Sequence, residues 1–350
     1  MKASIKKYTL DFKRPSGTSR GILRQKDTWF LILEEKGKIG IGECGMFKGL
    51  SIDDVPSYEK QLKLCCSAIE NDQLDLLDDL REFPSIQFGL EQAFRSLGST
   101  DPFRLFPSAF VDNKAQIPIN GLIWMGDKGF MLDQIQQQLE AGFRCIKMKI
   151  GAIDFKDELL VLETIRKKYS NEDIELRVDA NGAFDPNNAL DKLSSLAAFG
   201  LHSIEQPIKQ GNILEMKKLC MTTPLPIALD EELIGVFDIS KKRHLLKTIR
   251  PQYIILKPSL VGGYKGSEEW ISVAEEFDIG WWITSALESN IGLNAIAQWT
   301  FTLNTKMPQG LGTGSLFTNN ISSPLRVKNG YIYSDNEVGW NSSLIKDLCI

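Results

Sequence analysis

Residues 145–150 read CIKMKI and residues 175–180 read ELRVDA, two short runs in which charged and apolar residues alternate. Side chains two positions apart on a β-strand point to the same face. Lys147 and Lys149 therefore share one face of the first predicted strand, and Asp179 lies near the end of the second. Apolar strands that carry charge near their C-terminal ends are typical of a parallel sheet whose carboxyl edge forms a site.

Similar β-like runs recur along most of the chain. Seven of them begin 23 to 30 residues apart, the length of one strand–helix repeat, and amphipathic helix-like segments separate them. Repeated βα units predict a closed parallel barrel, with a weaker eighth run at 307–311. An open doubly wound sheet is the alternative, but no strand is followed by a GxGxxG or Walker-type loop. The seven runs are 116–123, 145–150, 175–180, 203–208, 226–230, 253–257 and 280–285.

The first 110 or so residues show a different pattern, with alternating strands followed by helices. We therefore predict an α/β protein, a (β/α) barrel of the modified TIM type over residues 113–319 with an α+β capping domain. The capping domain would take residues 1–112 and be completed by the tail, about 320–350. Its predicted strands are 2–12, 28–34 and 38–43, its predicted helices are 57–80 and 85–97, and a strand pair is predicted for 325–333.

Charge and composition restrict the class of protein. The 350 residues contain 41 basic and 45 acidic side chains, a formal net charge of −4, which argues against nucleic acid or an anionic membrane as partner. No apolar stretch approaches the roughly 18 residues of a membrane span, and the first 17 residues lack the apolar segment of a signal peptide. Six scattered cysteines without a CxxC pair fit a reducing compartment. We expect a cytoplasmic protein; its oligomeric state stays open.

Acidic and basic residues recur at the ends of consecutive predicted strands. Asp179, Glu205 and Asp230 follow one another in this way, and the C-terminal ends of barrel strands meet at one rim. Three buried carboxylates repel one another, so a dication is expected between them, and an all-oxygen ligand set suits Mg²⁺ or Mn²⁺. The basic residues at this rim are Lys147, Lys149 and Lys257.

Each of these residues also has an ordinary interpretation. A single charge at a strand end is commonly a turn residue or an ion-pair partner, and Lys147 alone fits that description. Charges at the ends of consecutive units favour one shared site instead. The chain has only two histidines, His202 and His244, which excludes a histidine-rich zinc centre and leaves acid–base work to lysine.

Together these motifs resemble the enolase superfamily, in its muconate-lactonizing subgroup, over essentially the whole chain. The matching motifs are KMK (147–149), VDAN (178–181), EQP (205–207), LDE (229–231) and LKPS (256–259). Within that subgroup the segment TSALESNIGL (284–293) resembles the seventh-strand segment of o-succinylbenzoate synthases.

The resemblance implies a mechanism for the strand-end charges. It implies that the three carboxylates hold one Mg²⁺, which binds the substrate carboxylate, and that Lys149 removes the proton α to that carboxylate. Lys147 would lower the pKa of Lys149 by like charge, and Lys257 would stabilise the enediolate from the opposite face. The implied reaction is the syn dehydration of 2-succinyl-6-hydroxy-2,4-cyclohexadiene-1-carboxylate to 2-succinylbenzoate, a step of menaquinone biosynthesis.

Further residues are candidates for orienting ligands or binding a small-molecule carboxylate substrate. Arg177 and Asn181 flank Asp179, and Glu231 is expected to pair with Lys149 or Lys147. The remaining candidates are Ser285 with Gly312 and Thr313 of the 310–314 loop, which either bind the succinyl carboxylate or serve as plain turn residues, and Arg20, in a segment that is either a lid or an ordinary exposed loop.

Two other functions remain as alternatives. The same superfamily contains N-succinylamino acid racemases and dipeptide epimerases, but dipeptide epimerases usually carry a DxD pair where residues 309–314 read QGLGTG. A barrel-derived binding or scaffolding protein without turnover is the second alternative. The cluster of buried charges argues against it, because unpaired buried charge destabilises a protein.

Overall fold

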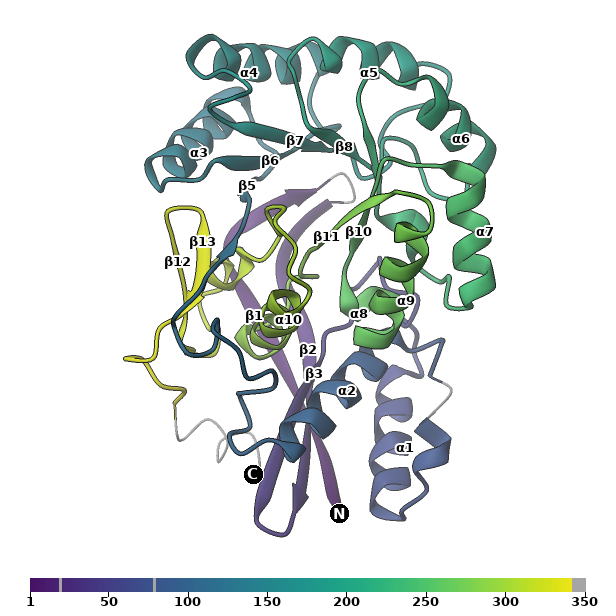
Figure 1. Cartoon of the computed structure of the whole chain (residues 1–350), viewed down its shortest axis with the longest axis vertical. Helices are drawn as coiled ribbons and strands as arrows, with labels where there is room; N and C mark the ends of the chain where they lie inside the picture. Colours follow the sequence, from purple (N-terminus) through teal and green to yellow (C-terminus); the bar gives the residue numbers. More distant parts are fainter. Residues whose placement is uncertain (19–20, 78–79, 342–350) are drawn as a thin grey trace.

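The computed structural model describes residues 1–18, 21–77 and 80–341 (Figure 1). Its central element is a curled parallel sheet of seven strands in the order β11-β10-β9-β8-β7-β6-β5. The predicted barrel fold is confirmed, and each strand lies within one of the seven predicted runs. The strands are β5 (Gly121–Ile123), β6 (Cys145–Lys149), β7 (Glu175–Asp179), β8 (Ser203–Glu205), β9 (Ile227–Leu229), β10 (Tyr253–Leu256) and β11 (Gly280–Ile283).

Helices follow the strands and cover the outer face of the sheet (Figure 1). Strand residues that point outward, such as Ile146, Val178 and Ile204, are fully buried in one large apolar cluster with these helices. The helices are α3 (Lys128–Glu140), α4 (Phe155–Lys168), α5 (Ala189–Ala197), α6 (Ile213–Thr222), α7 (Ile239–Ile249), α8 (Pro258–Val261), α9 (Gly263–Glu275) and α10 (Asn290–Thr302), with 3-10 turns at η2 (Glu231–Leu233) and η3 (Thr313–Leu316).

The eighth position of the barrel is filled without a regular strand. Gln309 forms a single parallel bridge with Ile119, and Gly310 forms one with Thr284, so this segment joins the two edge strands of the sheet. The weak eighth run therefore lies where it was predicted. Pro308 has no backbone N–H to donate, which helps to explain why the pairing stays limited to isolated bridges.

An antiparallel sheet of three strands, in the order β1-β2-β3, forms the other half of the molecule together with two helices (Figure 1). The helix predicted over 57–80 ends earlier than expected. Asp72 adopts the left-handed conformation with φ 58°, which polar turn residues tolerate, and a short 3-10 turn follows. The elements are β1 (Lys2–Thr18), β2 (Gly21–Glu35), β3 (Lys38–Cys44), α1 (Tyr58–Glu70), η1 (Leu74–Leu77) and α2 (Pro84–Gly98).

Helix α2 packs unusually closely on β3 because glycines meet at the contact. A Cβ atom placed on Gly42 would lie 1.9 Å from the backbone oxygen of Gly89. A Cβ atom placed on Gly89 would in turn lie 2.2 Å from Sγ of Cys44. This contact holds α2 in a fixed position between the antiparallel sheet and the barrel helices α8 and α9.

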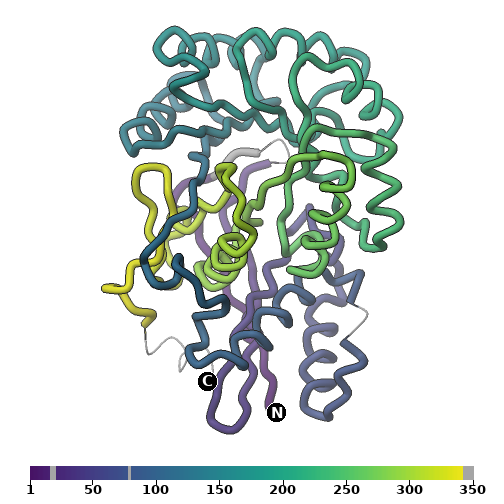
Figure 2. The backbone as a smooth tube through the Cα atoms, in the orientation of Figure 1, coloured from purple at the N-terminus to yellow at the C-terminus, as the bar shows by residue number. Residues whose placement is uncertain are grey.

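The C-terminal tail contacts both halves of the molecule. Its hairpin, β12 (Leu325–Lys328) and β13 (Tyr331–Ser334), pairs with β4 (Ile117–Pro118) at the start of the barrel. Just before it, Phe317 bridges Phe12 of β1, so the long β1–β2 hairpin reaches the rim of the barrel (Figure 2). The division into 1–112 with 320–350, and 113–319, remains a prediction.

Candidate active site

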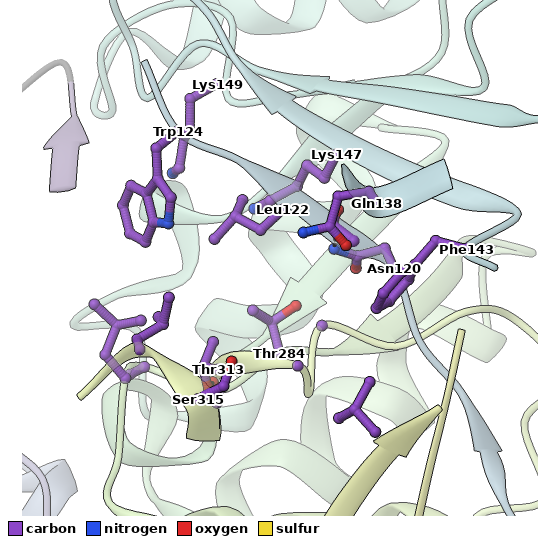
Figure 3. Close-up of a pocket in the computed structure, with 18 of the residues that line it drawn as sticks. Asn120, Leu122, Trp124, Gln138, Phe143, Lys147, Lys149, Thr284, Thr313 and Ser315 are labelled. Carbon is purple, nitrogen blue, oxygen red and sulfur yellow. Dashed lines mark hydrogen bonds between the residues drawn. The ribbon is translucent and has the colours of Figure 1, made fainter. Parts of the chain in front are cut away.

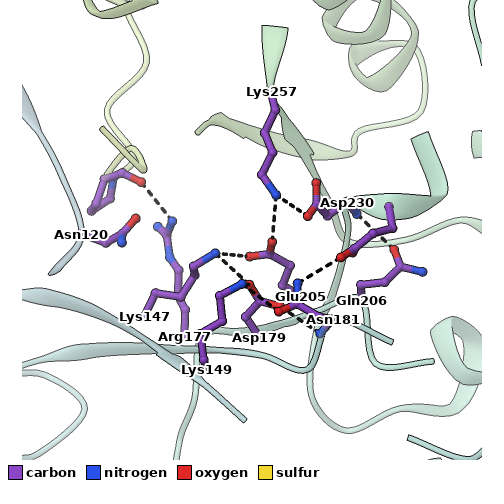
Figure 4. Close-up of polar contacts among 12 residues, drawn as sticks. Asn120, Lys147, Lys149, Arg177, Asp179, Asn181, Glu205, Gln206, Asp230 and Lys257 are labelled. Carbon is purple, nitrogen blue, oxygen red and sulfur yellow. Dashed lines mark hydrogen bonds and ion pairs between the residues drawn. The ribbon is translucent and has the colours of Figure 1, made fainter. Parts of the chain in front are cut away.

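The charged strand ends predicted to meet do meet at one rim of the barrel (Figure 4). Lys149 lies directly opposite Asp179 in the pairing of β6 with β7, and Asp179 lies opposite Glu205 in the pairing of β7 with β8. Asp230 and Lys257 each follow the last residue of the next two strands. Strand register alone therefore accounts for the convergence of these side chains.

Lys147 bridges two of the carboxylates. Its Nζ lies 2.9 Å from Oδ2 of Asp179 and 2.6 Å from Oε2 of Glu205. Burial disfavours its charged form, but the attraction of both carboxylates outweighs this effect and raises the pKa of Lys147 above its ordinary value. Lys147 is therefore cationic across the physiological pH range.

The pKa of Lys149 is shifted in the opposite direction. Its Nζ lies 2.6 Å from Oδ2 of Asp179 and 2.8 Å from Oδ1 of Asn181. Burial lowers the pKa of Lys149, and the positive charges of Lys147 and Lys257 lower it further, against the attraction of the Asp179 and Glu205 carboxylates. Of the three lysines, Lys149 is the one whose environment favours a neutral amine.

Lys257 contacts the carboxylates from across the rim. It forms an ion pair with Asp230, and its Nζ lies 3.6 Å from Oε1 of Glu205. Burial opposes its charge, but Asp230 and Glu205 outweigh burial and raise the pKa of Lys257. In Figure 4 it approaches from the strand opposite β6, so Lys149 and Lys257 face the same space from two sides.

The three carboxylates have the donor chemistry of a magnesium site. Across residues 1–18, 21–77 and 80–341, no three acidic, histidine or cysteine side chains have the arrangement of a formed metal site. Lysine ammonium groups instead contact the oxygens of Asp179, Glu205 and Asp230. Oε1 of Glu205 is buried and accepts no hydrogen bond from the described residues. The ligand set consists of oxygens alone, and one buried oxygen accepts no hydrogen bond from the described residues. This donor chemistry fits a hard cation such as Mg²⁺.

Two of the predicted ligand-orienting residues lie at the site and one lies below it. Nδ2 of Asn181 donates to Oε1 of Glu231 at 3.0 Å, so Glu231 is linked to Lys149 through the Asn181 amide. Arg177 instead lies one layer deeper in the barrel, where it pairs with Glu175 at 2.7 Å. Asp179 and Arg177 share a face of β7, but their side chains belong to different layers.

A cavity of about 390 Å³ opens above the lysines (Figure 3). Ser285, Gly312 and Thr313 line it, and the Ser285 and Thr313 hydroxyls are hydrogen-bonded at 2.6 Å. Arg20 lies outside the described residues. The lysines singled out from the sequence, Lys147, Lys149 and Lys257, also line the cavity.

Most of the remaining cavity wall is apolar and was missed from the sequence. Leu23, Phe47 and Leu50 come from the N-terminal half of the molecule, whereas Leu122 and Trp124 come from the start of the barrel. Figure 3 shows Trp124 beside Lys149. Isolated apolar residues from separate elements carry no local signal, so only the assembled fold identifies them.

Comparison with known proteins places this site in a family. Residues 131–345 match the family model described as "Enolase C-terminal domain-like". This match covers more than half of the chain and includes every strand-end charge described above. The chain belongs to the enolase superfamily.

Relatives within the superfamily differ strongly in their similarity to this chain. An o-succinylbenzoate synthase of Desulfotalea psychrophila is 45% identical over 95% of this chain and 98% of that protein. The crystal structure of MenC from Desulfotalea psychrophila superposes with a TM-score of 0.85 at 42% identity, covering 95% of this chain and 99% of that one. An L-Ala-D/L-Glu epimerase of Bacillus subtilis is 28% identical over only 48% of this chain and 45% of that protein.

One further property of this superfamily member concerns membranes. No helix in the described part of the chain is long and apolar enough to cross a bilayer.

Proposed function

We propose that this chain is an o-succinylbenzoate synthase, a hydro-lyase that converts 2-succinyl-6-hydroxy-2,4-cyclohexadiene-1-carboxylate to 2-succinylbenzoate and water in menaquinone biosynthesis. The observation that carries the proposal is the near full-length similarity, at 45% identity, to a synthase of that name. The convergence of two lysine-bearing strands on three carboxylates supports it independently.

Lys149 is the proposed base and acid. As a neutral amine it takes the proton from the carbon α to the ring carboxylate, and its environment favours that neutral form. The resulting ammonium group then gives the same proton to the departing hydroxyl, which leaves as water. The electron pair of the broken C–H bond completes the aromatic ring, so proton and electrons balance within one syn elimination.

Lys257 and Lys147 act as fixed positive charges in this proposal. Lys257 faces the substrate from the side opposite Lys149 and stabilises the negative charge that develops on the carboxylate as the proton leaves. Lys147 contacts two carboxylates, and its charge helps to keep the pKa of Lys149 low. Neither residue transfers a proton in the dehydration.

Asp179, Glu205 and Asp230 are the proposed ligands of Mg²⁺, with Mn²⁺ as the alternative ion. When bound, the ion supplies electrostatic stabilisation of the enediolate form of the substrate carboxylate. Asn181 and Glu231 stand beside these ligands and orient Lys149 through the Asn181 amide.

The cavity suits a ring with two carboxylate groups. Leu122 and Trp124 supply apolar surface for the ring, and the Ser285 and Thr313 hydroxyls supply donors for the second carboxylate. Backbone around Gly312 is the remaining candidate for that contact. We further propose that the enzyme is cytoplasmic, acts on a small-molecule carboxylate rather than nucleic acid, and divides into the capping and barrel units predicted from the sequence.

Racemisation of N-succinylamino acids is the second candidate activity. It is favoured by one observation, the presence of Lys257 on the face opposite Lys149, where it would deliver a proton to invert the α-carbon. Dipeptide epimerisation is less well supported, because residues 309–314 contain no acidic pair.

One pair of assays tests the proposal. The purified protein is incubated with the cyclohexadiene substrate and Mg²⁺ while 2-succinylbenzoate is measured, and separately with N-succinylamino acids in D₂O. We expect dehydration to be the more efficient activity by kcat/KM. Rapid α-proton exchange without dehydration would reject the synthase in favour of a racemase.

A further inference from the structure

A buried charged cluster lies outside the catalytic residues, where β2 and β3 meet the segment after β11. Lys26 of β2 is 7% exposed, and both Glu43 of β3 and Glu288 are fully buried. Burying charged groups costs several kcal/mol each unless the protein compensates them. The contacts of each group show which of them has a purely structural explanation.

Glu43 is fully accounted for as a helix cap. Its carboxylate accepts hydrogen bonds from the backbone N–H of Ser289 and of Gly292, both at 2.8 Å, and from the Thr28 hydroxyl at 2.8 Å. A carboxylate at this position satisfies the free N–H groups at the start of α10 and complements its dipole. Glu43 therefore needs no further role.

Glu288 and Lys26 are not accounted for in this way. Oε1 of Glu288 accepts a hydrogen bond from the Ser259 hydroxyl, but Oε2 has no hydrogen-bond partner among the described residues. Nζ of Lys26 likewise has none, although it attracts both Glu43 and Glu288 electrostatically. A Cβ atom placed on Gly45 would lie 3.4 Å from Nζ of Lys26, 3.2 Å from Cγ of Glu288 and 3.6 Å from Oγ of Ser259. The three side chains thus surround one point.

Each of these side chains belongs to a segment that forms the catalytic cavity. Ser259 lies two residues after Lys257, and Glu288 directly follows Leu287, which lines the cavity. Lys26 lies three residues after Leu23, a cavity residue of the N-terminal half. The cluster therefore joins the capping strand to both barrel segments behind the cavity.

We propose that Glu288 is a positioning residue, hydrogen-bonded to Ser259 and attracted by Lys26, that keeps Lys257 and the 284–287 segment in register with the capping strand β2. The kinetic part of the proposal rests on the proposed synthase activity; the structural part does not. Glu288 touches neither substrate nor reacting atoms in this account. It acts through Ser259 on the start of α8, and so on Lys257.

The kinetic test compares Ser259→Ala, Glu288→Ala and Glu288→Gln. We expect Ser259→Ala and Glu288→Ala to lower kcat about ten-fold with KM changed by less than about two-fold, because Lys257 acts on the transition state. Glu288→Gln keeps an oxygen acceptor for Ser259 and should retain more of the kcat than Glu288→Ala. The matched control is Glu91→Gln, since Glu91 also joins α2 to the barrel, by accepting from the Tyr264 N–H, but does not line the cavity.

Hydrogen–deuterium exchange of the same proteins supplies a readout that does not depend on activity. Glu288→Ala should speed amide exchange in both 257–261 and 284–289, whereas Glu91→Gln should leave these segments unchanged. A folded Glu288→Ala protein with wild-type kcat and unchanged exchange at 257–261 would overturn the proposal, as would a loss of thermal stability alone. Absence of dehydration by the wild type would reject the synthase, and the exchange data would still decide the role of Glu288.

Discussion

Lys149 and Asp179 lie directly opposite each other on neighbouring strands, with Nζ of Lys149 2.6 Å from Oδ2 of Asp179. The proposed base therefore contacts an oxygen atom of a proposed metal ligand. Lys147 lies 2.9 Å from the same oxygen, so the two lysines share it. The protonation of Lys149 is set by a balance of burial and the like charges of Lys147 and Lys257 against the two carboxylates of Asp179 and Glu205.

Asp230 provides the cleanest test of the metal ligands. Asp230→Asn replaces the carboxyl group that directly follows β9 with an amide, so Mg²⁺ affinity measured by titration calorimetry should fall by more than about ten-fold. The control is Asp238→Asn, at the exposed N-cap of α7, which should bind Mg²⁺ like the wild type. Equal affinities in the two variants would remove Asp230 from the ligand set.

Arg177 provides a test of how the barrel is closed. Its guanidinium group is 1% exposed, pairs with Glu175 at 2.7 Å and donates to the Pro308 carbonyl at 2.9 Å, which joins β7 to the irregular eighth segment. Arg177→Met removes a buried cation that pairs with the partly exposed Glu175, and it should lower the free energy of unfolding by about 2–3 kcal/mol in urea denaturation.

The control for that variant is the exposed pair of Arg243 with Glu276 at 2.6 Å. Arg243→Met should leave the free energy of unfolding nearly unchanged, because solvent screens surface ion pairs. If the free energy of unfolding falls by the same amount in both variants, the contact of Arg177 with the irregular eighth segment has no special role in stability.

Much of the site followed from the sequence because its signals are local. Lys147, Lys149 and Asp179 occupy alternate positions on short apolar runs, and strand periodicity places them on the inner face without knowledge of other elements. The same periodicity could not assign Arg177 to the lower layer, since a shared face does not give the height in the barrel.

Other features depend on contacts between distant segments. Lys26 and Glu288 are 262 positions apart, and neither stands in a motif that indicates burial beside the other. The helix predicted to continue to residue 80 ends at Glu70, because the left-handed backbone at Asp72 outweighs the apolar spacing of the leucines that follow. The cavity residues Leu23 and Trp124 were missed because they come from distant segments that meet only in the folded chain.

Glu91 predicts a pH dependence of stability. Burial raises the pKa of its carboxyl from 4.5 to about 7, against hydrogen bonds from the α9 backbone. Between these values the unfolded chain binds fewer protons at this group than the folded chain, so Glu91 makes the protein less stable as pH rises from about 4.5 to 7. The effect is at most about 3 kcal/mol.

The comparison of wild type with Glu91→Gln isolates this contribution. The difference in free energy of unfolding, measured by urea denaturation at several pH values, should shift in favour of the variant as pH rises through this range. A difference that does not change with pH would show that the Glu91 carboxyl titrates normally in the folded protein.

The turnover of Lys149→Ala, measured together with its Mg²⁺ affinity, tests the central claim most directly. We predict that kcat for dehydration falls by at least about a thousand-fold, because the proton-transfer group is lost, while Mg²⁺ binding by titration calorimetry persists. The control Lys167→Ala removes an exposed side chain that pairs with Glu163 on the surface of α4, and it should match the wild type in both measurements. Appreciable dehydration by a metal-binding Lys149→Ala protein would contradict the assignment of a single lysine as base and acid.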